Sequence, residues 1–225
     1  MAATAAAIGA LRLVLASNNA KKLGELQALL AGLPVQLVAQ GSLNIGEADE
    51  PHHSFVENAL AKARHAARAA GGAALADDSG LCVGALGGAP GVISAHFAGE
   101  VPVVGGEDRE ARRRRQDGAN NAALLAALAA LGPHADRRAH FISTLVAVRH
   151  ADDPEPLVAV GRWQGEILPA ARGQHGFGYD PLLWIPALGA TVAELPADLK
   201  NQHSHRARSA AALRAMLAEA WHLQA

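Results

Sequence analysis

Residues 73–80 read Ala-Ala-Leu-Ala-Asp-Asp-Ser-Gly, and this stretch decides the fold expected for the chain. Its four small apolar residues predict a short buried strand that runs directly into two carboxylates. Two apolar runs before it, residues 11–16 and 35–39, also predict strands. Helical segments are expected after each of the first two strands, one with leucines along one face and one capped at Ser54. This alternation predicts a mixed α/β sheet.

The second half of the chain favours paired strands. Residues 140–149 and 157–163 flank a polar turn and are expected to form an antiparallel pair. Before them, a helix is expected around residues 124–131, and a closing helix over 209–217. No repeat or linker divides the sequence, so we expect one domain over residues 1–225, with residues 1–9 and 104–118 mobile. The arginines at 112–115 are expected to form a solvated face.

Composition narrows the class of protein. The 225 residues carry a net charge of −1, which gives no positive field for a nucleic-acid backbone. The single cysteine, Cys82, excludes an internal disulfide, and its apolar neighbours favour a buried thiol over a nucleophile. Arg12 interrupts the apolar start of the chain, and no uninterrupted apolar run approaches the ~20 residues of a membrane span. We therefore expect a cytoplasmic protein that binds small molecules or copies of itself, without nucleic-acid or membrane partners.

Residues 17–22, Ser-Asn-Asn-Ala-Lys-Lys, lie between an expected strand and an expected helix. Such a junction offers unpaired backbone N–H groups and the positive end of a helix dipole, which together can bind phosphate. Taken alone, an ordinary helix N-cap followed by solvated lysines explains the same residues equally well.

The adjacent carboxylates Asp77 and Asp78 are the most specific signal. At the end of a strand they would repel each other unless a proton or cation lay beside them. Oxygen ligands at a sheet edge suit Mg²⁺, which also binds substrate phosphates, and a carboxylate beside the ion can accept a proton from water. The alternative is an Asx turn that caps the backbone.

Two other groups of polar residues precede this pair, and each is a weaker signal of a functional site. Glu47, Asp49 and Glu50 form an acidic loop that either completes a metal site or is simply solvated. Asn58 and Lys62 lie four residues apart, on one face of the capped helix, and either face a cleft or are scattered surface residues.

The C-terminal third carries a glycine-rich loop and a basic segment. Residues 176–181 place Phe177 and Tyr179 between glycines, so the aromatic rings either stack on a base or pack inward. Lys200 and residues 204–206, Ser-His-Arg, provide donors for a purine carbonyl or merely begin a basic helix.

In this order the segments resemble the inosine triphosphate pyrophosphatase family, the RdgB-like enzymes that hydrolyse dITP, ITP and XTP. The resemblance spans residues 11 to about 217 and is carried by segments 17–22, 55–59 with 62–63, 76–81, 86–91, 176–181 and 204–206.

The resemblance implies an elongated mixed α/β fold with two lobes around a central cleft, a homodimer, and Mg²⁺ as cofactor. It implies that water attacks the α-phosphorus with Asp78 as general base, which releases pyrophosphate. Asp78 and Asp49 would bind the metal. The implied triphosphate-binding residues are Ser17, Asn18, Asn19, Ala20, Lys21, Lys22, Lys62 and Ser79. The implied base- and sugar-binding residues are Phe177, Gly178, Tyr179, Asp180, Lys200, His205 and Arg206.

Some positions depart from the family pattern. Asp49 stands where glutamate is expected, which leaves the choice between Asp49 and Glu50 as metal ligand open. Pro51-His52-His53 replaces a Thr-Gly-type stretch, and His96-Phe97 replaces Arg-Tyr. Two rival functions remain at this point: a pyrophosphatase for modified pyrimidine or ordinary triphosphates, and a nucleotide sensor without catalysis.

Overall fold

The computed structural model describes residues 10–223, which build a seven-stranded mixed sheet in the order β2-β1-β3-β4-β5-β6-β7. The first three strands in this order are parallel to one another, and every later pairing is antiparallel. The strands are β1 (Leu11–Leu15), β2 (Val35–Ala39), β3 (Ala74–Val83), β4 (Arg138–Val148), β5 (Leu157–Ile167), β6 (Leu183–Ile185) and β7 (Ala190–Thr191). The α-helices are α1 (Ala20–Leu29), α2 (Phe55–Ala70), α3 (Arg109–Ala130), α4 (Ala197–His203) and α5 (His205–Ala220). The mixed sheet with flanking helices predicted from the sequence is confirmed.

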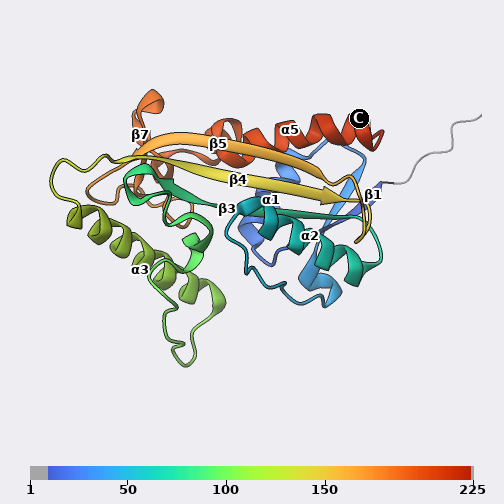
Figure 1. Ribbon diagram of the computed structural model, residues 1–225, viewed down its shortest axis with the longest axis horizontal. Helices are drawn as coiled ribbons and strands as arrows, with labels where there is room; N and C mark the ends of the chain where they lie inside the picture. Colours follow the sequence, from blue (N-terminus) through green and yellow to red (C-terminus); the bar gives the residue numbers. More distant parts are fainter. Residues whose placement is uncertain (1–9, 224–225) are drawn as a thin grey trace, which may run out of the picture.

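Helices cover both faces of the sheet, with α5 above the long β4–β5 pair and α2 below it in Figure 1. Leucines of α1 and α5, such as Leu26 and Leu213, pack with Leu13 and Leu75 on one face. On the other face α2 presents small residues, including Ala59 and Ala63, which allow close approach to the sheet.

Helix α2 is capped at both ends. Its N-cap is Ser54, whose side chain accepts a hydrogen bond from the Glu57 N–H, and its C-cap is Gly71 in the left-handed conformation.

The third strand is longer than predicted. The sequence suggested that it ends at Ala76, but β3 continues to Val83, and every residue in it has a partner on β4. Asp77 and Asp78 therefore lie inside the strand rather than in an Asx turn after it, because the antiparallel ladder with β4 already satisfies the backbone there.

The two ends of β3 belong to different parts of the core. Residues 74–76 belong to the core beside α1, α2 and α5, whereas Leu81 and Val83 belong to a separate cluster with Leu124 and Leu128 of α3. The polar residues 77–80 separate these two packed regions.

The segment expected to be mobile before the third helix is helical from Arg109 onward. Asp108 caps this helix by accepting a hydrogen bond from the Ala111 N–H, so the arginine run lies in its first turns. Residues 1–9, also expected to be mobile, lie outside the described residues. The antiparallel pair β4–β5 is confirmed, and none of the helices between residues 10 and 223 is long and apolar enough to cross a membrane.

Candidate functional site

The free edge of β3 creates the site. β1 pairs with β3 only through Val14–Ala74 and Leu15–Leu75, so the edge of β3 next to Asp77 is not covered by a parallel strand. A cavity of about 570 Å³ lies there. The side chains of Lys22 and Lys62 reach this edge, and each ammonium lies 3.4 Å from the Asp77 carbonyl oxygen.

Most of the residues predicted for the site line this single cavity. Ala20 instead lines an adjoining cavity of about 380 Å³ that it shares with Ser17, Asn18 and Asn19. Lys21 and Asp49 line neither of these two cavities. The predicted residues in the larger cavity are Ser17, Asn18, Asn19, Lys22, Lys62, Asp78, Ser79, Phe177, Gly178, Tyr179, Asp180, Lys200, His205 and Arg206.

Asp78 is a buried carboxylate with one paired oxygen. Its Oδ1 atom accepts a hydrogen bond from Lys62 Nζ at 2.7 Å, while the buried Oδ2 atom has no hydrogen-bond partner among the described residues. Burial raises the pKa of Asp78 to about 6, against the opposing effect of the Lys62 ammonium. A carboxyl group with this pKa and one unpaired oxygen is suited to accept a proton near neutral pH.

Glu50, rather than Asp49, approaches Asp78. Lys62 Nζ lies 3.0 Å from Glu50 Oε2, so one ammonium links the two carboxylates. Burial alone would raise the pKa of Glu50, but the adjacent Lys62 lowers it. Both acids are exposed, but only Glu50 lines the cavity. The sequence alone could not show which of these two adjacent acids lines the cavity.

Asp77, whose side chain is fully buried, belongs to a separate ion network. Its carboxylate lies 3.0 Å from Arg206 Nε and 3.2 Å from Lys22 Nζ, and it accepts a hydrogen bond from the Ser143 hydroxyl at 2.9 Å. Burial would raise the pKa of Asp77, but Lys22 and Arg206 lower it far below its usual range. This carboxylate therefore remains ionised and organises cations, and it is unsuited to accept a proton.

The turn at residues 17–22 is both a helix cap and a wall of the cavity. Asn19 Oδ1 accepts hydrogen bonds from the backbone N–H groups of Lys21 and Lys22 at 3.0 and 3.3 Å, so the N-cap alternative holds for this side chain. Lys22 still points its ammonium to the free edge of β3. Burial lowers the pKa of Lys22, and Asp77 opposes this shift. Lys21 does not line the cavity; its ammonium lies 3.0 Å from Glu110 of α3 and 5.8 Å from the centroid of the Phe177 ring.

Asn58 has a different role from that of Lys62. Its side chain exchanges two hydrogen bonds with the backbone of His52, at 3.0 and 3.1 Å, and does not line the cavity. This buried amide fixes the loop that precedes α2 and carries Glu50.

The glycine-rich loop presents one aromatic ring to cations and buries the other. Phe177 is half-buried, and the Lys200 ammonium lies 4.8 Å from its ring centroid. Tyr179 packs inward, where its hydroxyl donates a hydrogen bond to the Ser94 carbonyl oxygen at 2.9 Å. Asp180 is buried, accepts a hydrogen bond from the Phe177 N–H at 2.9 Å and pairs with Lys200 at 2.9 Å. Of the two aromatic residues, Phe177 is therefore the one available for stacking.

The segment at residues 204–206 begins α5, with Ser204 as the N-cap. Burial lowers the pKa of His205 well below its usual value, which keeps the imidazole neutral, and its Nδ1 atom has no partner among the described residues. The guanidinium of Arg206 is committed to Asp77, Glu25 and the Ser79 hydroxyl. Arg206 therefore contributes to the site mainly by organising its charges.

The sequence analysis did not identify two groups of residues that support the site. Glu25 of α1 pairs with both Arg206 and Lys200. Asp117 and Asn121 of α3 hold Gly178, whose N–H donates to Asp117 at 2.8 Å and whose carbonyl accepts from Asn121 at 3.1 Å. Glu25 follows Lys22 by one helical turn, which is the only signal the sequence offered; nothing in it placed α3 beside the glycine-rich loop.

The carboxylates fit a divalent cation of the Mg²⁺ type. No group of three or more His, Cys, Asp or Glu side chains suited to a metal occurs in the part of the chain from residue 10 to 223. Mg²⁺, however, often takes only one or two protein carboxylates and completes its shell with water and substrate phosphates. The unpartnered Oδ2 of Asp78 and the nearby Glu50 provide such a pair.

The fold and the site define an α/β protein with a cavity where two lysines lie beside a carboxylate able to accept a proton. Residues 13–216 match the model of the Ham1 family, and the chain belongs to that family. This confirms the resemblance drawn from the motifs.

Related proteins and a solved structure match this chain over nearly its whole length. A protein of Methylibium petroleiphilum called dITP/XTP pyrophosphatase is 65% identical over 211 residues, which is 94% of this chain and 99% of that protein. A dITP/XTP pyrophosphatase of Burkholderia pseudomallei is 57% identical, over 92% and 94% of the two chains. The structure of a HAM1 protein from Coxiella burnetii matches with a TM-score of 0.82 and 40% identity, covering 93% of this chain and 99% of the other.

Proposed function

We propose that the protein hydrolyses non-standard purine nucleoside triphosphates, such as dITP, ITP and XTP, to the monophosphate and pyrophosphate. The observation that carries this proposal is the single cavity that brings together Asp78, the turn at residues 17–22 and the glycine-rich loop. The names of the related proteins support the substrate class. The reaction would remove such nucleotides from the cytoplasmic pool.

Each wall of the cavity has a separate role in this proposal. The ammonium groups of Lys22 and Lys62, at the free edge of β3, bind the phosphates and neutralise their charge. The carboxylate of Asp78, whose pKa is raised to about 6, accepts the proton of the attacking water. The α-phosphorus–oxygen bond to the leaving pyrophosphate then breaks, and the lysines stabilise the charge that develops on it.

Asp78 and Glu50 would hold Mg²⁺, which supplies charge neutralisation at the phosphates and lowers the pKa of water. Glu50 replaces Asp49 in this role because it alone of the two lines the cavity and approaches Lys62.

The base would lie between Phe177 and the buried donors near α5. Lys200 is 7% exposed and His205 is 5% exposed, so a donor left unpaired by the wrong base has little access to water. A 6-oxo purine accepts from such donors, whereas the 6-amino group of adenine would face them with another donor, at a cost of about 1–3 kcal/mol. We therefore expect adenine nucleotides to be poor substrates. The homodimer implied by the family resemblance remains part of this proposal.

The decisive experiment measures products from dITP, with and without Mg²⁺. Release of pyrophosphate together with dIMP supports the proposal, whereas release of inorganic phosphate with dIDP would refute it. Comparison with XTP, dGTP and dUTP distinguishes the purine reaction from a pyrimidine pyrophosphatase. Binding of dITP without any turnover would instead indicate a nucleotide sensor.

A further inference from the structure

The arginines at residues 112–115 lie on α3, and only some of them line the main cavity. Five residues of α3 line the main cavity at helical spacing, and three of them are arginines. Positions i, i+3, i+4, i+7 and i+8 fall on one face of a helix, so these residues form a continuous stripe along the cleft. The stripe consists of Arg109, Arg112, Arg113, Gln116 and Asp117.

The remaining arginines of the run face elsewhere. Arg115 is bound to Glu107 and to the Pro102 carbonyl oxygen, which fixes the loop before α3. Arg114 lies 4.0 Å from Glu110, is well exposed and does not line the cavity. The sequence predicted one solvated face for all four arginines, whereas Arg112 and Arg113 line the cavity and Arg114 does not.

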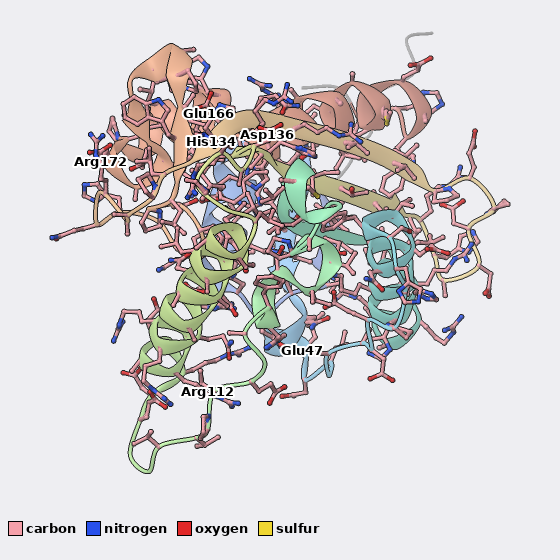
Figure 2. All side chains as sticks on the ribbon, turned by 60° about the vertical axis from the view of Figure 1, so that its left-hand side comes forward. Glu47, Arg112, His134, Asp136, Glu166 and Arg172 are labelled. Atoms are coloured by element: carbon pink, nitrogen blue, oxygen red, sulfur yellow. The ribbon has the colours of Figure 1, made fainter. Side chains whose placement is uncertain are left out.

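Glu47 connects this stripe to the turn at residues 17–22. Its Oε1 atom accepts a hydrogen bond from Asn18 Nδ2 at 3.0 Å and from Arg109 at 3.1 Å. Both charged side chains of the Glu47–Arg109 pair are about two-thirds exposed, so the pair is screened by water and is readily exchanged. Glu47 and Arg112 both lie on the lower side of Figure 2, whereas the other labelled charged residues lie at the upper end of the molecule.

The arginines have weak competing partners. Arg112 lies 3.6 Å from Glu100, in a pair whose carboxylate side is largely exposed. Arg113 has no ion pair with any other residue in the described range 10–223. A guanidinium in a cleft with Lys22 and Lys62 provides forked donors that match phosphate oxygens.

We propose that Arg109, Arg112 and Arg113 form a second polyphosphate-binding wall opposite the β3 edge, and that the carboxylate of Glu47 occupies its donors when no polyphosphate is bound. Entry of a polyphosphate replaces Glu47 as acceptor for Arg109 and Asn18. The wall favours ligands with several linked phosphates, because such ligands offer more oxygens to its forked donors than a single phosphate does. This inference rests on the proposed function for its natural ligand, but its test does not require turnover.

The test measures binding of inorganic tripolyphosphate to the full chain by calorimetry, with Mg²⁺ present. We expect Arg113→Ala and Arg109→Ala each to weaken binding about 5–10-fold, the size of one lost charge-assisted contact. Arg114→Ala is the matched control, since it removes the same charge one residue away from the stripe, and it should change the dissociation constant less than about twofold. Glu47→Gln should tighten binding about 2–5-fold because the competing charge is removed.

Equal effects of Arg113→Ala and Arg114→Ala would overturn the inference, since they would indicate only a general loss of positive charge. Failure of the unsubstituted protein to bind tripolyphosphate would overturn it as well. Turnover of dITP is measured separately on the same variants. Loss of the proposed function alone, with arginine-dependent binding retained, would leave the second phosphate wall standing.

Discussion

Asp77 and Asp78 are neighbours in the chain, yet their side chains lie on opposite faces of the sheet. Asp77 contacts Arg206 of α5, whereas Asp78 contacts Lys62 of α2. Successive residues of a strand alternate between faces, so each carboxylate has its own cation and its own pKa. The repulsion expected from adjacent acids is reduced by the sheet itself, because the two carboxylates form their ion pairs with different cations.

Asp78→Asn should remove catalysis without unfolding the protein. The amide cannot accept the proton from water, so we expect the rate of dITP hydrolysis to fall by about 10²–10⁴-fold. Lys62 keeps Glu50 as a partner, and the thermal midpoint should change little. Steady-state kinetics and a melting curve check both parts, and near-normal activity would show that another group is the base.

Asp77→Asn makes the same chemical change one residue earlier, but here we expect the main effect to be a loss of stability. It removes the carboxylate paired with Lys22 and one of the two carboxylates paired with Arg206, the other being Glu25, which costs about 3–5 kcal/mol of unfolding free energy. Chemical denaturation of both variants gives the comparison. A thermal midpoint for Asp77→Asn equal to that of Asp78→Asn would contradict the separate roles assigned here.

The carboxyl group of Asp78 should titrate well above an ordinary aspartate. Burial raises its pKa to about 6. Since the unfolded pKa is about 3.9, the folded protein binds this proton more tightly than the unfolded chain. The contribution of Asp78 to stability is therefore present below about pH 4 and is lost as the pH rises through about 6. A carbon-13 NMR titration in Mg²⁺-free buffer checks this value, with Asp78→Asn identifying the resonance.

Glu50→Gln and Asp49→Asn separate the two candidate metal ligands. We expect Glu50→Gln to raise the Mg²⁺ concentration for half-maximal activity at least about tenfold, because loss of a carboxylate ligand weakens the site. Asp49→Asn should leave this concentration within about twofold, since Asp49 does not line the cavity. Activity measured across a Mg²⁺ series decides the matter, and the reverse result would restore Asp49 as the ligand.

Gly161→Ala should destabilise the junction of β5 with α5. A methyl group there would collide with the His205 carbonyl oxygen and lie 2.5 Å from the Ser209 backbone nitrogen. Backbone cannot move aside as a side chain can, so we expect a loss of about 1–3 kcal/mol or more. Gly118→Ala in α3 meets nothing within 4 Å and should instead stabilise the protein by about 0.5–1 kcal/mol. Denaturation of the two variants tests this contrast.

The sequence by itself determined the local elements and the family. Apolar runs and the Ser54 cap predicted β1, β2 and α2 nearly to the residue, because these signals act within a few residues of chain. The six motifs, in order, indicated the family. Most of the site residues named from them line one cavity.

Only the tertiary structure decided how those residues divide their roles. The length of β3 depends on its ladder with β4, whose paired residues lie 56–74 positions further along the chain, and this ladder sends Asp77 and Asp78 to opposite faces. That Glu50 lines the cavity while Asp49 does not, and that Arg112 and Arg113 also line it, depends on how α2 and α3 pack against distant segments. Local patterns carry no information on such long-range contacts, because burial and charge pairing are properties of the assembled chain.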